Sequence, residues 1–111
     1  MNFSESLKKN KDFQKVYRKG KSYANKYLVM YVTENQDAKN KIGISVSKKV
    51  GNSVVRHRIT RLIRESYRLQ EENFKSGYTI VIIARANSKD KPYRDIESAL
   101  IHLAKLHNIY E

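Results

Sequence analysis

One long amphipathic segment limits the architectures open to this chain. Gly51-Asn52-Ser53 reads as a helix break followed by a cap, and a helical pattern continues from there to about Glu72. At about 100° per residue, one side of this helix collects Val55, Ile59, Leu62, Ile63, Ser66 and Leu69. Because an apolar stripe of this kind must be covered, we expect the helix to dock on a β-sheet.

The other side of the same helix is basic. A continuous polar arc holds Arg56, Thr60, Arg64, His57, Arg68 and Arg61, with Arg58 at its border. Lys48 and Lys49 directly precede the first turn, where the free N–H groups of a helix favour an anion. The surface could be an ordinary solvated helix face. Arginine rather than lysine dominates the row, however, which favours structured contacts to phosphates or base edges.

The distribution of charge also indicates a polyanionic partner. The 111 residues include 23 Lys and Arg against 11 Asp and Glu, for a net charge of +12. Residues 1–68 hold 17 of the basic and five of the acidic residues, while residues 69–111 hold six of each. Crowding of one sign destabilises a folded chain unless a partner neutralises it. We expect one RNA-binding domain over residues 1–111, a length that suits a single core.

The rest of the chain alternates between helix and strand patterns. Asn10 reads as the N-cap of a helix that Gly20 closes. Strands are expected over 23–33, 41–47 and 78–84, and a last helix is expected after Pro92. Its apolar stripe is formed by Ile96, Leu100, Leu103 and Ala104. The pattern predicts the order αββαβα and an α+β fold.

Aromatic side chains are the second sign of nucleic-acid binding. Phe13 and Tyr17 share one face of the first helix. In the strand expected over 23–33, alternation places Tyr23, Asn25, Tyr27 and Tyr31 opposite the core residues Leu28, Met30 and Val32. The next strand turns the small residues Gly43, Ser45 and Ser47 outward. Aromatics among basic residues could stack on unpaired bases, at about 1–3 kcal/mol per base.

The sequence offers little catalytic chemistry of its own. It has no Cys, which excludes disulfides, cysteine-ligated zinc and thiol catalysis. His102 and His107 are about 140° apart on a helix and form no metal-binding pair, and the carboxylates lie outside the basic stretch. We expect RNA binding without unaided cleavage, no signal peptide or membrane span, and a cytoplasmic location.

At residues 48–65, KKVGNSVVRHRITRLIRE, the chain closely resembles the signature of the bacterial ribonuclease P protein component family. The similarity continues at Asp12-Phe13-Gln14-Lys15-Val16-Tyr17 with Gly20, at Ala24-Asn25, and at the segments GISVS (43–47) and IIAR (82–85). It spans nearly the whole chain.

The resemblance implies an αβββαβα two-layer sandwich, similar to a ribosomal-protein domain, with a left-handed βαβ crossover. It implies that the long helix binds the catalytic RNA subunit and that a cleft between the first helix and the sheet binds the single-stranded 5′ leader of precursor tRNA. We expect the RNA subunit to be bound by Lys48, Lys49, Arg56, His57, Arg58, Arg61, Arg64 and Arg68. Of these, Arg56, Arg61 and Arg64 match the RNA-contacting arginines of the family. We expect the leader to be bound by Phe13, Tyr17, Asn25, Lys26, Tyr31, Ser45 and Ser47. Of these, Phe13, Tyr17 and Tyr31 match the aromatic cleft positions of the family.

The same resemblance implies that the catalytic centre lies in the RNA, which would hold the required Mg²⁺, with one protein per RNA; protein-bound metal sites stay open. His57 stands where the family usually has Asn, and Thr60 where it usually has Lys. A ribosomal or assembly protein is the alternative from another class. Sequence-specific DNA binding is less favoured, because no second helix precedes the arginine helix by a short turn.

Overall fold

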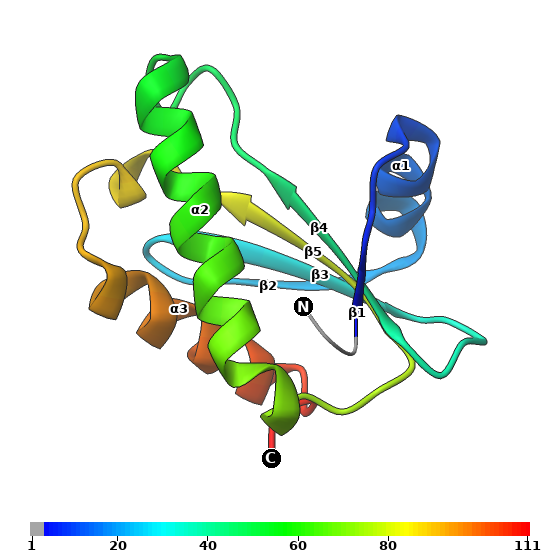
Figure 1. Ribbon diagram of the computed structural model, residues 1–111. Coiled ribbons are helices and arrows are strands. Elements are labelled where there is room, and N and C mark those ends of the chain that lie inside the picture. The colour runs from blue at the N-terminus through cyan, green and yellow to red at the C-terminus, as the bar shows by residue number, and fades with distance from the viewer. Residues whose placement is uncertain (1–3) are drawn as a thin grey trace.

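The structure is a computed structural model in which residues 4–111 are described (Figure 1). The single domain expected over 1–111 is therefore described from residue 4 onward. The elements follow the order βαβββαβα. They are β1 (Ser4–Ser6), α1 (Asn10–Lys19), β2 (Lys21–Ala24), β3 (Leu28–Glu34), β4 (Asn40–Ser45), α2 (Ser53–Gln70), β5 (Tyr78–Ala84) and α3 (Tyr93–Leu106), with the short 3-10 turns η1 (Glu71–Asn73) and η2 (Ala86–Ser88).

The strands form one mixed sheet in the order β1-β4-β5-β3-β2. β5 lies at its centre, parallel to β4 and antiparallel to β3, and the pairs Met30↔Ile82 and Ile42↔Ile80 set the register. Paired residues of β3, β4 and β5 therefore direct their side chains to the same face of the sheet. This explains why β5 is apolar on both faces, with Val81 as buried as Ile80 and Ile82.

Helices cover both faces of the sheet (Figure 1). α2 and α3 lie on one face and enclose the main core, which includes Leu28, Met30, Ile59, Ile63, Ile82 and Leu100. α1 lies against the other face, where Val16 and Val81 are buried outside that main core. α2 and α3 thus cover one face of the sheet. On the other face, part of the sheet lies beside α1, and a cleft can form there.

The connection from β4 through α2 to β5 is left-handed. With α2 toward the viewer in Figure 1 and both strands running to the upper left, the chain passes from β4 to the strand on its left-hand side. Nearly all such crossovers are right-handed. The expected α+β sandwich with this crossover is confirmed, and its αβββαβα order is extended by the short strand β1, which pairs with β4 in parallel.

The prediction of a single strand over 23–33 is wrong. Asn25 interrupts it, and β2 folds back on β3 as an antiparallel hairpin. The Asn25 side-chain carbonyl accepts hydrogen bonds from the backbone N–H groups of Tyr27 (3.2 Å) and Leu28 (3.0 Å), which stabilises the turn. The turn also reverses the chain direction, so the alternation drawn through residues 23–33 does not carry over from one strand to the next.

The predicted helix boundaries agree with the structure to within two residues. Asn52 caps α2, accepting a hydrogen bond from Val55 N–H (3.0 Å), as predicted. Asn10 is the first residue of α1 rather than its N-cap, which is Lys9. Gly20 ends α1 at a crowded point, where a Cβ would lie 2.6 Å from the carbonyl oxygen of Val16.

The buried side of α2 is rotated from the predicted stripe. Leu69 was expected on the sheet but is 53% exposed, whereas the side chain of Tyr67 is fully buried. The Tyr67 hydroxyl is hydrogen bonded to Ser4 Oγ (2.7 Å) and receives a hydrogen bond from Asn40 Nδ2 (3.3 Å). Within residues 4–111, no helix is both long and apolar enough to cross a membrane.

Candidate nucleic-acid interface

The arginine surface of α2 is exposed along the length of the helix. We use this name for Lys48, Lys49, Arg56, His57, Arg58, Arg61, Arg64 and Arg68. All of these except Arg56 are exposed, and no acidic residue lies in the first turn of α2. Lys48 and Lys49 lie in the turn before the helix, which buried Val50 anchors to the core. The structure therefore brings the eight predicted residues together on one element and the turn that precedes it.

Arg56 differs from its neighbours because it borders the buried side of α2. Its Nε is buried without a hydrogen-bond partner among the described residues. The next turn is closed by Thr60, whose hydroxyl donates to the Arg56 carbonyl (2.9 Å). Thr60 thus serves the helix backbone and adds no charge to the surface.

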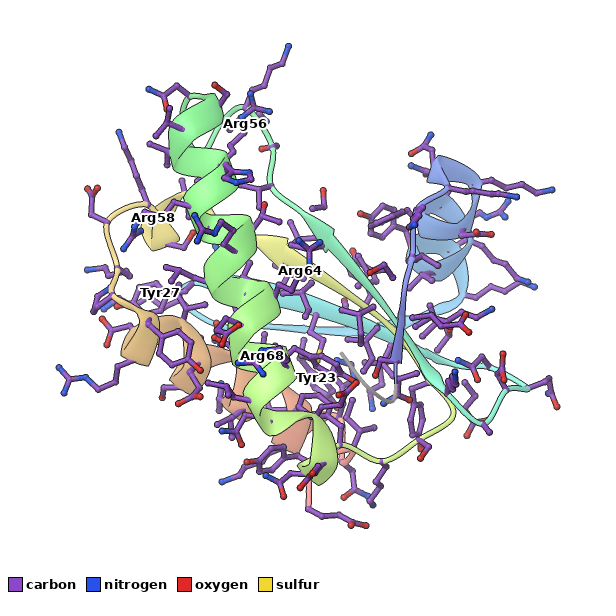
Figure 2. All side chains as sticks on the ribbon, in the orientation of Figure 1. Tyr23, Tyr27, Arg56, Arg58, Arg64 and Arg68 are labelled. Atoms are coloured by element: carbon purple, nitrogen blue, oxygen red, sulfur yellow. The ribbon has the colours of Figure 1, made fainter. Side chains whose placement is uncertain are left out.

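Arg58 has a structural role in the fold. Its guanidinium donates to the carbonyl oxygens of Lys91 (3.0 Å) and Lys89 (3.4 Å), so it ties α2 to the loop before α3. Figure 2 shows Arg58 directed toward η2, whereas Arg64 lies on the side of α2 toward β4. Arg58 still adds charge to the surface, but two of its five N–H donors are used within the fold.

Arg68 is also paired. It forms a two-pronged salt bridge with Glu65, with Nε 3.0 Å from Oε2. The hydrogen bonds between Arg68 and Glu65 lower the pKa of the Glu65 carboxyl and raise the pKa of the Arg68 guanidinium. This is the one ion pair among residues 4–111, so Arg61 and Arg64 face solvent without a carboxylate partner there.

An aromatic cluster lies on the opposite face of the sheet, at the place where the resemblance implies a cleft. It consists of Phe13 and Tyr17 of α1 and Tyr31 of β3, and we call it the aromatic cleft. The ring centroids of Tyr17 and Tyr31 are 5.1 Å apart, and those of Phe13 and Tyr17 are 6.5 Å apart. Gly43 of β4 lets Phe13 approach the sheet, because a Cβ there would lie 2.7 Å from the Phe13 ring. All three rings are partly exposed and can offer stacking surface.

Tyr23 and Tyr27 do not belong to this cleft, which corrects their predicted placement beside Tyr31. The hairpin register pairs Tyr23 with Met30, so Tyr23 faces α3, where its ring meets His107 at 4.7 Å. Both tyrosines pack against the main core, on the side of α2 and α3 (Figure 2). The misplacement has one cause, the unrecognised turn at Asn25.

Asn25 and Lys26 lie apart from the three cleft rings. Asn25 Nδ2 donates to the Ala99 carbonyl (2.9 Å) and lies 3.1 Å from His102 Nδ1, both on α3. Lys26 is exposed in the turn, with its Nζ 5.9 Å from the centroid of the Tyr27 ring. These two residues thus lie beside α3 rather than beside α1.

Ser45 and Ser47 follow Gly43 along the chain toward α2. Alternation along β4 places Ser45 on the same face of the sheet as Gly43, which faces the Phe13 ring. Ser47 is exposed just beyond the end of β4 and adjoins Lys48. The strand therefore leads from the aromatic cleft to the start of the arginine surface.

One exposed cation, Arg85, was not among the site residues predicted from the sequence. Arg85 follows β5, and its Nη1 donates to the Asn25 carbonyl (2.8 Å). Alternation from Val81 through Ile83 could have placed it on the face of α1. For metals, no group of three or more His, Asp or Glu side chains within residues 4–111 is arranged to hold an ion.

The fold and the two surfaces together define a class: a small basic α+β protein with the surface chemistry of an RNA-binding subunit. The family model described as Ribonuclease P matches residues 1–107. A relative from Lachnoclostridium phytofermentans named "Ribonuclease P protein component" is 67% identical over 106 residues, covering 96% of this chain and 91% of the relative. One of the same name from Clostridium botulinum strain Langeland is 57% identical over 105 residues, covering 94% and 95%.

Solved structures agree with the sequence comparisons. The RNase P protein of Staphylococcus aureus superposes with a TM-score of 0.88 at 38% identity, covering 96% of this chain and 97% of that one. The chain belongs to the ribonuclease P protein component family, part of a tRNA-processing ribonuclease.

Proposed function

We propose that this chain is the protein subunit of ribonuclease P, binding the catalytic RNA subunit with α2 and the 5′ leader of precursor tRNA in the aromatic cleft. In this role it assists the endonucleolytic removal of the leader, which produces the mature 5′ end. It acts as a single copy bound to one RNA, in the cytoplasm.

The observation that carries the proposal is the separation of the two surfaces by the sheet. The arginine surface lies with α2 on one face, and the rings of Phe13, Tyr17 and Tyr31 lie under α1 on the other. Two RNA elements can therefore be held at once without competing for the same side chains. A subunit that joins a catalytic RNA to its substrate needs such an arrangement.

On α2, the side chains free of intramolecular partners carry the binding. Arg61 and Arg64 are exposed and lie about one helical turn apart, which suits contacts to successive phosphates of folded RNA. His57 lies on the same arc and can donate a hydrogen bond, as an Asn could, and it can also stack on a base. Each neutralised phosphate releases counterions, which favours binding most at low salt.

In the cleft, the three rings hold an unpaired strand. The T-shaped contact of Tyr17 with Tyr31 fixes both rings before any RNA binds, so little side-chain entropy is lost on stacking. Mature tRNA lacks the leader and cannot use these contacts. The cleft thus favours precursor over product.

The hydrolysis itself is assigned to the RNA subunit. We propose that Mg²⁺ would be held mainly by that RNA, where it would supply the metal-ion chemistry of phosphodiester hydrolysis. The contribution of this chain is to neutralise phosphates through α2 and to orient the leader through the cleft.

The proposal is tested by reconstitution with the RNA subunit. We expect the protein to lower the Mg²⁺ concentration needed for precursor cleavage and to bind precursor more tightly than mature tRNA. Tyr17→Ala should weaken precursor binding about 5- to 150-fold, the equivalent of one stacked base, with little effect on mature tRNA. Tyr27→Ala is the matched control, since its ring lies on the other face. Equal losses for precursor and mature tRNA would exclude the cleft as the leader site.

A further inference from the structure

The outer side of α1 is a third basic surface, separate from the two described above. Between residues 8 and 19 the chain carries six cations and one carboxylate, a net charge of +5 out of the total of +12. All six are exposed: Lys8, Lys9, Lys11, Lys15, Arg18 and Lys19. We call this set the α1 basic surface.

No internal partner accounts for these charges. The one ion pair within residues 4–111 is on α2, so no cation of the α1 basic surface has a carboxylate within salt-bridge distance there. Crowding like charges on a ten-residue helix costs stability, which a bound polyanion would offset.

The α1 basic surface adjoins the aromatic cleft through α1 itself. Phe13 and Tyr17 occupy the inner side of the helix. Going round the axis from Tyr17, Gln14 follows after about 60°, Arg18 after about 100° and Lys15 after about 160°. A strand that leaves the stacked rings therefore meets these cations next, whereas α2 lies on the far side of the sheet (Figure 1).

The residue types distinguish this surface from that of α2. Five of its six cations are Lys, while residues 54–68 of α2 hold five Arg and no Lys. Arginine suits fixed, bidentate contacts with structured RNA. Lysine is a mobile point charge that tolerates many phosphate positions, as an unstructured strand requires.

We propose that the α1 basic surface binds the phosphates of the distal leader, beyond the nucleotides held in the aromatic cleft, without sequence preference. The inference rests on the proposed function, because it requires the leader in the cleft. It predicts that long leaders gain affinity through electrostatic contacts that short leaders cannot reach.

The test compares precursors with leaders of about 4 and about 16 nucleotides, the usual limits for single-strand binding grooves. Binding to the reconstituted holoenzyme is measured over a range of salt concentrations. The variant is Lys15→Gln/Arg18→Gln, which keeps helix propensity. The matched control is Arg94→Gln/Lys105→Gln, which removes one Lys and one Arg from the exposed side of α3.

For the long leader, the variant should lose several-fold in affinity, and its log–log salt slope should become shallower by about 1.4, since each single-strand phosphate contact contributes about 0.7. The short leader and the control variant should show no change in slope. An equal loss for long leader, short leader and mature tRNA would place the contacts on folded RNA and overturn the inference, as would no loss. If the wild-type holoenzyme fails to prefer precursor over mature tRNA, the proposed function fails first.

Discussion

Replacing Gly43 with alanine should displace Phe13 from the aromatic cleft. The new Cβ would lie 2.7 Å from Cε1 and Cζ of Phe13 and 3.2 Å from Cδ2 of Leu7. Carbon atoms pack best at about 3.5–4.0 Å, so the Phe13 ring must move by about 1 Å or change rotamer. The end of the Leu7 side chain can yield by the few tenths of an ångström required.

The stability effect should reverse sign with the residue at position 13. Overpacking costs about 1–3 kcal/mol, while alanine in a strand interior gains about 0.5–1 kcal/mol over glycine. Gly43→Ala should therefore lower the free energy of unfolding by about 0.5–2 kcal/mol in the wild-type background. In a Phe13→Ala background the ring is gone, and the same change should be neutral or stabilising by up to about 1 kcal/mol.

Urea unfolding of the four proteins of this double-mutant cycle, followed by circular dichroism, measures the coupling. Binding of leader-bearing precursor should fall in Gly43→Ala and in Phe13→Ala, and the second change should add little to the first. Equal destabilisation by Gly43→Ala in both backgrounds would refute the reasoning, because the Phe13 ring would then not be the group that the methyl displaces.

Two further predictions concern the packing of His107 and the division of labour on α2. Burial lowers the pKa of His107, against the raising effect of its hydrogen bond to the Met30 carbonyl (2.8 Å). The unfolded chain therefore binds this proton more readily, and stability should fall as pH drops below the ordinary value of about 6.5. Urea unfolding between about pH 7.5 and 5.5 should show a smaller decrease for His107→Gln, and an unchanged decrease would contradict the assignment. On α2, Arg58→Ala should cost about 1 kcal/mol of stability through its lost hydrogen bonds to the loop, whereas Arg61→Ala should leave stability unchanged and weaken binding to the RNA subunit. The reverse pattern, measured by urea unfolding and by titration with RNA, would exclude these roles.

Periodicity predicted the elements that bury a continuous stripe or ladder. The strand over 78–84 has the predicted bounds, and the four apolar residues of the α3 stripe are all buried. These predictions hold because burial over several turns or pairs depends on the local pattern alone. The short strand β1 has no such pattern, since its residues Ser4–Ser6 are polar and join the sheet only through pairing with β4.

The candidate site was predicted in part for the same reason. The cations of α2 share one helix, so helical geometry alone places them together. The cleft requires the register between β2 and β3, which depends on a turn whose bonds are made by the Asn25 side chain. Tyr31 kept its predicted face because it lies in the same strand as Met30, while Tyr23 lies across the turn.

The charge distribution also predicts how salt affects the free protein. Within residues 4–111, added salt can weaken one attractive ion pair, between Arg68 and Glu65. The repulsion that salt can screen comes from a net charge of +12 on the whole chain. Added salt shortens the screening length from about 30 Å at 0.01 M to about 10 Å at 0.1 M, so it should relieve more repulsion than it removes attraction. The urea midpoint should therefore rise with sodium chloride. The Lys15→Gln/Arg18→Gln variant should be more stable than wild type at low salt and should gain less from added salt, because part of the repulsion on α1 is already gone. A midpoint that falls with salt would mean that attractive pairs outweigh the crowding, and the premise that a polyanion offsets this crowding would be wrong.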